Sequence, residues 1–170
     1  VIPHGAGEVV RIDFHPDASA SDTATLDLNG FNETVNSIRT SSSGAVFIDN
    51  TGSNNSTLTI GADSAAATYT ASGTNALTFR DTGSGTLSLQ KTGTGTATFS
   101  GASVAFLHSG STGVDGGGTL NISSTLAATT GLTATGSSSL LDIDGIITAP
   151  SGITTVGVND GATLDIQNGG

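Results

Sequence analysis

The sequence predicts an all-β protein, a right-handed parallel β-helix (β-solenoid) with about 20 residues per coil. Three observations lead to this fold class. The residues Glu, Lys, Gln, Arg and Met, which favour helices, total only 8 of 170. Short segments of alternating apolar and polar residues return along the chain, and they return at related intervals.

The repeated segment is a four-residue cassette such as Thr25-Leu26-Asp27-Leu28, with two apolar side chains on one face of a strand. The equivalent cassettes cover residues 25–28, 57–60, 76–79, 86–89, 96–99, 119–122, 140–143 and 163–166, and Val46 and Ile48 mark one more. Their first apolar residues recur at about 20 residues, with half-steps of about 10 in the middle of the chain. We therefore expect Leu89 and Ile122 to point into a dry lumen.

Turn sequences separate these cassettes, for example Asn29-Gly30, Thr92-Gly93 and Asp160-Gly161. An antiparallel sandwich would also show strands every 8–12 residues. The mutual resemblance of the cassettes and the thin apolar content favour the solenoid, because a narrow lumen needs only one or two aliphatic residues per strand. We expect residues 24–170 to form a single solenoid domain and residues 1–23 an N-terminal segment that serves as a junction strand or a first coil.

Composition excludes several classes of function. The net charge is -10 with only 4 Lys and Arg, so a phosphate-binding patch and nucleic-acid binding are not expected. The chain has no Cys, which excludes disulfides, thiolate zinc sites and cysteine nucleophiles. No apolar run is long enough for a membrane helix, so membrane insertion is not expected. The chain starts at Val1 without a basic and apolar leader, which suggests a processed chain or a fragment.

Two stretches resemble the autotransporter-associated β-strand repeat family. Residues 26–35, LDLNGFNETV, are similar to the opening motif of that repeat, and residues 87–101, LSLQKTGTGTATFSG, are similar to its most recognisable motif. Glu33 replaces the usual Gln, Ala97 replaces a larger aliphatic residue, and 104–118 is less regular than the family's loop. The resemblance covers about residues 24–122. It implies a secreted or surface-displayed bacterial β-solenoid without catalytic residues, often exported as a passenger.

In the second motif we expect Leu87 and Leu89 to fill the lumen and Phe99 to fill the next side. Gly93 and Gly95 would allow a close approach or a positive φ at the corner. Lys91 is expected to lie outward at the end of its strand, since it is charged.

The candidate chemistry is sparse. Asp13 and His15 would share a strand face, as metal ligands could, with His4 and Asp17 nearby in sequence, and Asp142 and Asp144 form a second such pair. We interpret both groups as solvated surface positions. An enzyme of this fold would need clustered carboxylates, or carboxylates with Arg or Lys, in a groove. Here the four cations Arg11, Arg39, Arg80 and Lys91 are scattered, and His108 is placed in an ordinary loop. No catalytic residue, cofactor or metal ligand is predicted.

The sequence-based hypothesis is a non-enzymatic structural protein at the cell surface or outside the cell. It would be a subunit of a bacterial fibre that assembles head to tail as a homopolymer, since no polar cap covers either end of the predicted coil stack. The alternative is an adhesive passenger fragment with a cell-surface or glycan ligand. Ice binding by the Thr pairs 57/59 and 96/98 is disfavoured, because Asp or Asn occupies the equivalent position in other cassettes.

Overall fold

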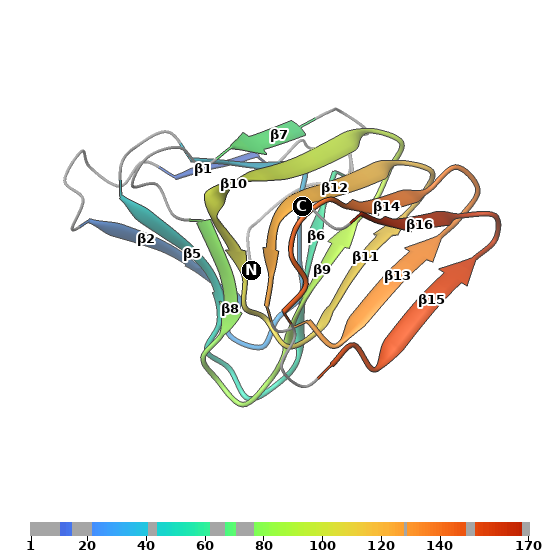
Figure 1. Cartoon of the computed structure of the whole chain (residues 1–170). Helices are drawn as coiled ribbons and strands as arrows, with labels where there is room; N and C mark the ends of the chain where they lie inside the picture. Colours follow the sequence, from blue (N-terminus) through green and yellow to red (C-terminus); the bar gives the residue numbers. More distant parts are fainter. Residues whose placement is uncertain are drawn as a thin grey trace.

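The computed structural model describes residues 11–14, 22–40, 44–61, 67–70, 77–127, 129–148 and 152–167, which form strands and no helix. The strands stack in parallel sheets as a β-solenoid of about five turns with about 23 residues per turn (Figure 1). The predicted fold class is confirmed. The turn is somewhat longer than the predicted step of about 20 residues.

Each turn passes over three faces, which we number in chain order. Face 1 contains β2 (Thr23–Asp27), β5 (Ala45–Asn50) and β8 (Leu77–Asp81). Face 2 contains β3 (Glu33–Val35), β6 (Ser56–Ile60), β9 (Leu87–Lys91), β11 (Ser111–Asp115), β13 (Gly131–Thr135) and β15 (Thr155–Asn159). Face 3 contains β1 (Arg11–Phe14), β4 (Ser37–Thr40), β7 (Ala67–Thr70), β14 (Leu140–Ile143) and β16 (Thr163–Ile166).

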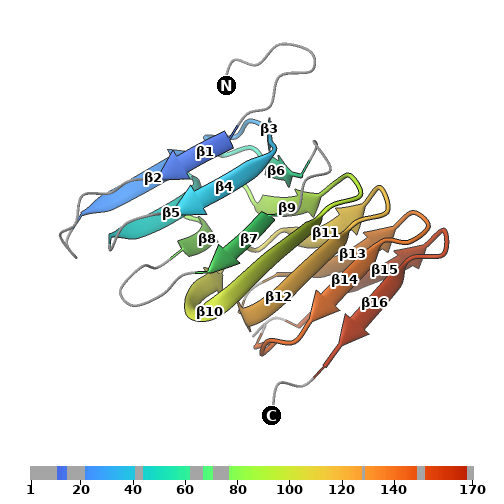
Figure 2. The ribbon, with the colours of Figure 1, turned by 90° about the horizontal axis from the view of Figure 1, so that it is seen from above.

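Two long strands, β10 (Thr96–Phe106) and β12 (Thr119–Leu126), run over the corner between face 3 and face 1. The first part of β10 pairs with β7, and Val104–Phe106 pairs with β8. The register between β10 and β12 shifts between Ser100 and Ala105, where Gly101 has a φ of 109°. Figure 2 shows β7, β10, β12, β14 and β16 side by side on face 3.

Parallel, in-register pairing places equivalent residues of successive turns in columns. On face 3, for example, Leu120 lies between Ala97 and Leu141, and Leu164 follows next. The first lumen-facing residues of three successive strands lie on three successive faces of one turn. They are Leu77 of β8, Leu87 of β9 and Ala97 of β10. The predicted half-steps of about 10 residues thus correspond to the number of residues from one face to the next.

The lumen is filled by aliphatic and aromatic side chains from all three faces. Leu89 and Ile122 are buried, as predicted. Phe79 and Phe106 stack along face 1 with ring centroids 4.8 Å apart, and Phe99 of face 3 meets each of them edge to face at 5.4 Å. This aromatic layer fills the lumen at the turn where the long strand β10 changes faces.

The prediction for Lys91 is wrong, because this side chain is fully buried. In β9 the burial alternates, so Lys91 faces the same side as Leu87 and Leu89. Its ammonium group donates hydrogen bonds to the carbonyl oxygens of Thr92 and of Gly93, the latter at 2.9 Å. Gly93 has a φ of 72°, so the predicted positive φ at this corner is confirmed there. The alternation of the strand places the Lys91 side chain inside although it is charged, and the backbone carbonyls at the corner accept hydrogen bonds from its ammonium group.

Candidate functional site

The sequence-predicted metal residues are only partly described. His4, His15 and Asp17 lie outside the described residues, while Asp13 is an exposed residue of β1 whose Cα is aligned with that of Arg39. Nowhere in the described part of the chain do three or more His, Cys, Asp or Glu side chains come together so that they could hold a metal ion. The interpretation of Asp13 and His15 as solvated positions stays a prediction.

The second pair, Asp142 and Asp144, belongs to a ladder of polar residues on the outside of face 3. Asn121, Asp142 and Asp165 are aligned on neighbouring strands, and Asn121 Nδ2 donates a hydrogen bond of 2.8 Å to Asp142 Oδ2. Burial raises the pKa of Asp142, and the charges of Asp144 and Asp165 raise it further. The ladder therefore concentrates negative charge toward the C-terminal turn.

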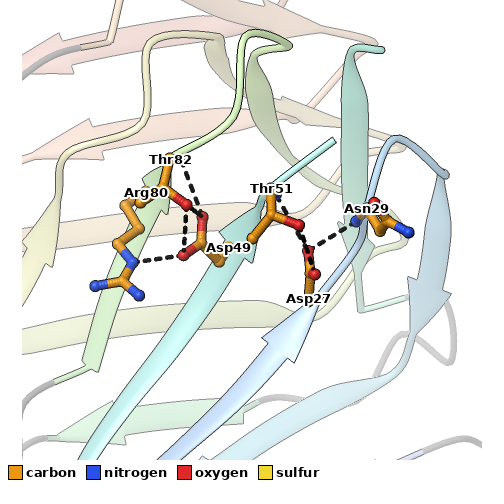
Figure 3. Close-up of polar contacts among 6 residues, drawn as sticks. All are labelled: Asp27, Asn29, Asp49, Thr51, Arg80 and Thr82. Atoms are coloured by element: carbon orange, nitrogen blue, oxygen red, sulfur yellow. Dashed lines mark hydrogen bonds and ion pairs between the residues drawn. The ribbon is translucent and has the colours of Figure 1, made fainter. Parts of the chain in front are cut away.

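Other carboxylates, which the sequence did not reveal, accept hydrogen bonds at the corners between face 1 and face 2 (Figure 3). Asp27 accepts hydrogen bonds from the backbone N–H groups of Asn29 (2.9 Å) and Thr51 (3.1 Å) and from the Thr51 hydroxyl (2.7 Å). Burial alone would raise the pKa of Asp27, but these hydrogen bonds hold it below its ordinary value.

Asp49 repeats this arrangement one turn later, accepting hydrogen bonds from the Thr82 N–H and hydroxyl, both at 3.1 Å. It also forms an ion pair with Arg80, with Nε 2.6 Å from Oδ2 (Figure 3). The Arg80 guanidinium lies 3.9 Å from the centroid of the Phe47 ring. An Asp–Arg pair could serve a hydrolytic site, but here Asp49 is buried and every contact joins one turn to the next. The pair is structural.

His108 lies in the loop that follows β10, as predicted, and its side chain is completely buried. Its Nε2 lies 2.9 Å from Thr112 Oγ1, which lies 3.4 Å from Thr129 Oγ1, and Thr129 donates to the Gly110 carbonyl at 2.7 Å. Burial lowers the pKa of His108 to about 4, although the charge of Asp81 acts in the opposite direction. The His–Thr contact resembles a base beside a hydroxyl nucleophile. Both groups are fully buried, however, so a substrate cannot reach them.

The Thr pairs do not form one array. Thr57 and Thr59 lie on β6 of face 2, whereas Thr96 and Thr98 lie on β10 of face 3. The column of Thr59 continues through Gln90, Gly113 and Thr133, and the column of Thr98 continues through Asn121, Asp142 and Asp165. This interruption argues against a flat ice-binding surface.

The most distinctive surface is the last described turn, which contains β15 and β16 and which we call the open coil. Val156, Val158 and Ile166 are 59%, 47% and 49% exposed. Their aligned partners in the turn before, Leu132, Ala134 and Ile143, are each 0% exposed. In the described part of the chain, the apolar columns that fill the lumen become exposed at this last turn, where β15 and β16 each pair with one other described strand.

The opposite end of the stack is formed by β1, β2 and β3, and in the described part of the chain each of these also pairs with one strand. Phe14 of β1 is buried and Ile12 is half-buried, whereas Arg11 and Asp13 are exposed. Arg11 Nε donates a hydrogen bond of 3.1 Å to Ser37 Oγ of β4. Among the described residues, β1 thus has an apolar inner side and a charged outer side.

Comparison of the chain with protein-family models, with curated proteins and with solved structures gave no match. Among the described residues, there is no helix of the length and hydropathy that crossing a bilayer requires.

Proposed function

We propose that this chain is a non-enzymatic structural protein, a β-solenoid subunit of an extracellular or cell-surface fibre that assembles head to tail. The observation that carries this proposal is the open coil. A further turn of the same three-sided cross-section would pair the outer edges of β15 and β16 and cover Val156, Val158 and Ile166.

The N-terminal end of a second copy has the features that such a turn requires. It presents one strand on each of the three faces, and Ile12 and Phe14 lie on the inner side of its face 3 strand. Contact between opposite ends is heterologous, so it repeats without closing and gives a filament rather than a ring or a dimer. The net charge of -10 opposes this contact at long range. At about 0.15 M salt the screening length is only about 8 Å, and short-range pairing and apolar burial dominate.

The use of the charged groups supports a structural rather than a catalytic role. Asp27 and Asp49 are saturated by corner hydrogen bonds, Arg80 is held by Asp49, and Lys91 is buried against carbonyl oxygens. His108 is enclosed among aromatic rings and Thr side chains. Each of these groups strengthens the solenoid by linking turns or closing corners.

The experiment is sedimentation velocity and light scattering of the purified chain over a wide range of concentration, followed by electron microscopy. We expect growth with concentration and filaments one solenoid wide. The double substitution Val156→Lys and Ile166→Lys should block growth by placing charges on the open coil. The matched control is Leu107→Lys, because Leu107 is 47% exposed but lies in the middle of the stack.

A chain that stays monomeric at every concentration, with a strand-rich circular dichroism spectrum, would contradict the fibre proposal. Specific binding of that monomer to cells or to a glycan array would then favour the adhesive passenger fragment. Equal inhibition by Leu107→Lys and by the open-coil variant would show that association does not use the ends.

A further inference from the structure

The loop between β10 and β11, residues 107–110, is bonded to the turn before it, and we call it the His108 loop. The Ser109 N–H and hydroxyl donate to Asp81 Oδ1 and Oδ2, both at 2.7 Å. The Gly110 N–H donates to the Leu87 carbonyl at 3.0 Å. A Cβ atom at Gly110 would lie only 2.2 Å from the Leu87 carbonyl oxygen, so the loop rests directly on the backbone of the preceding turn.

The same loop is also bonded to the turn that follows. The Thr129 hydroxyl donates to the Gly110 carbonyl at 2.7 Å, and the Thr130 hydroxyl donates to the Ser109 carbonyl at 2.7 Å. The Thr130 N–H adds a longer bond of 3.3 Å to the Gly110 carbonyl. The His108 loop therefore links three successive turns at the corner between face 1 and face 2.

The imidazole of this loop is enclosed in the lumen. His108 is fully buried, and its ring centroid lies 6.3 Å from that of Phe79 and 5.9 Å from that of Phe106. Its Nε2 lies 2.9 Å from the hydroxyl of Thr112, which is also fully buried. A neutral imidazole suits this aromatic surrounding, whereas an imidazolium would lose most of its hydration there.

Among the described residues, Asp81 is the titratable group whose charge acts on His108. Its carboxylate is already bound by Ser109 and by the Leu87 N–H, the latter at 3.1 Å. Burial lowers the pKa of His108 to about 4, although the charge of Asp81 and a backbone hydrogen bond with Ser111 both favour the protonated form. The closed loop therefore disfavours a proton that the same imidazole would accept in water.

We propose that His108 is an acid-sensitive switch, whose protonation moves the imidazole out of the lumen and opens the His108 loop while the flanking strands stay paired. The strands are held independently of the loop, because β10 pairs with β8 and β12, and β11 pairs with β9 and β13. Opening breaks the bonds to Asp81, Leu87, Thr129 and Thr130 and loosens the link between three turns. This inference does not depend on the fibre proposal.

The direction of the pH effect follows from the two states of the loop. In the open loop the imidazole has its ordinary pKa of about 6.5, and in the closed loop its pKa is about 4. The open loop therefore binds the proton more strongly. Its population should be constant above about pH 6.5 and should rise about tenfold per pH unit from there down to about pH 4.

The test is amide hydrogen exchange of the folded chain by NMR from pH 4 to 7, expressed as protection factors so that the intrinsic pH dependence of exchange is removed. We expect the protection of the Ser109 and Gly110 amides to fall about tenfold per pH unit below about pH 6.5. The reference is the Leu140 amide, which donates to the Gly118 carbonyl at 2.9 Å on face 3. At pH 4 it should be at least about tenfold better protected than the two loop amides. Equal protection of loop and reference at every pH would mean that only global unfolding occurs, and would overturn the switch.

Two variants identify the group that responds to acid. In His108→Gln, whose side chain is neutral at every pH, the protection of the loop amides should no longer change between pH 6.5 and 4, whereas Asp81→Asn should retain the change. If the change persists in His108→Gln and is lost in Asp81→Asn, the carboxylate is the trigger and the proposal is wrong. The comparison of loop and reference amides in the wild-type chain needs neither variant, so it decides the proposal even if a substitution prevents folding.

Discussion

The buried amide of Asn50 should be one of the most sensitive positions in the molecule. Asn50 ends β5 and is completely buried, and its side chain bonds three turns together. Its Oδ1 accepts hydrogen bonds from the N–H groups of Gly30 (2.8 Å) and Gly52 (3.2 Å). Its Nδ2 donates to the carbonyl oxygens of Asn54 (2.9 Å) and Thr86 (3.1 Å). All four partners are backbone groups at the corner between face 1 and face 2.

Asn50→Ala removes these four hydrogen bonds at once. Each backbone group that is left buried without a partner costs about 1–3 kcal/mol. The partners lie at a corner that is partly open to solvent, so water can replace some of the bonds, and we expect a total loss of about 2–4 kcal/mol. For a chain of this size, this loss lowers the melting temperature by about 5–15 °C.

The assay is thermal and urea unfolding followed by circular dichroism. Asn50→Asp is the shape-matched variant, because it keeps the acceptor and sets an oxygen against the two carbonyl oxygens, so it should be at least as unstable as Asn50→Ala at neutral pH. Ser53→Ala is the control, since Ser53 is exposed at the same corner. A melting temperature of Asn50→Ala within about 2 °C of the wild type would refute the reasoning.

Three further predictions concern the lumen, the buried imidazole and the outer ladder. Leu89→Ala should destabilise the fold by about 2–5 kcal/mol in denaturant titrations, and a change below about 0.5 kcal/mol would show that Leu89 is not in the lumen. His108 stays neutral in the folded chain down to its lowered pKa of about 4, while in the unfolded chain it takes up a proton below about pH 6.5. The free energy of unfolding should therefore decrease as the pH is lowered from about 6.5 to about 4. In His108→Gln the decrease in the free energy of unfolding over this pH range should be smaller by an amount on the order of 3 kcal/mol. The same decrease in the variant as in the wild type would contradict this prediction. Asp142→Asn should raise stability at pH 7 by about 0.2–1 kcal/mol, because it removes a like charge beside Asp165. Since the folded pKa of Asp142 is raised, this gain should shrink in melts at lower pH, as the wild-type carboxyl becomes protonated.

The fold could be predicted because the lumen imposes the same requirement on every turn. Alternation within a cassette fixes which side chains are buried, and the spacing of Leu120, Leu141 and Leu164 matches the length of a turn, so position and register both appear in the sequence. The irregular part was harder. In β10 a single strand turns a corner through Gly101, and its two halves pair with different strands, which no cassette reveals.

The polar interior could not be predicted for a different reason. Residue type suggested an exposed position for Lys91, but it is buried because backbone carbonyls at the corner accept hydrogen bonds from its ammonium group. Nothing in the sequence indicated that the His108 side chain is buried beside Thr112. The Asp27–Thr51 bond spans 24 residues, and the Asp49–Thr82 bonds span 33. An Asp at the end of a strand, followed one turn later by a Thr two positions further on, is the sequence signal that could have identified these corners.

These corner bonds also have a direction along the chain. Asp27 accepts from Thr51, Asp49 accepts from Thr82, and Asp81 accepts from the N–H and hydroxyl of Ser109, so in each case the carboxylate precedes its donors. When a turn has formed and the next one has not, its corner carboxylate is hydrated at the surface, and this costs little free energy. A chain that emerges N-terminus first, during synthesis or passage through a narrow pore, would therefore meet ready acceptors at every step. At Asp27, Asp49 and Asp81, folding in this direction leaves no buried carboxylate without its donors, because each carboxylate stays hydrated until the next turn forms.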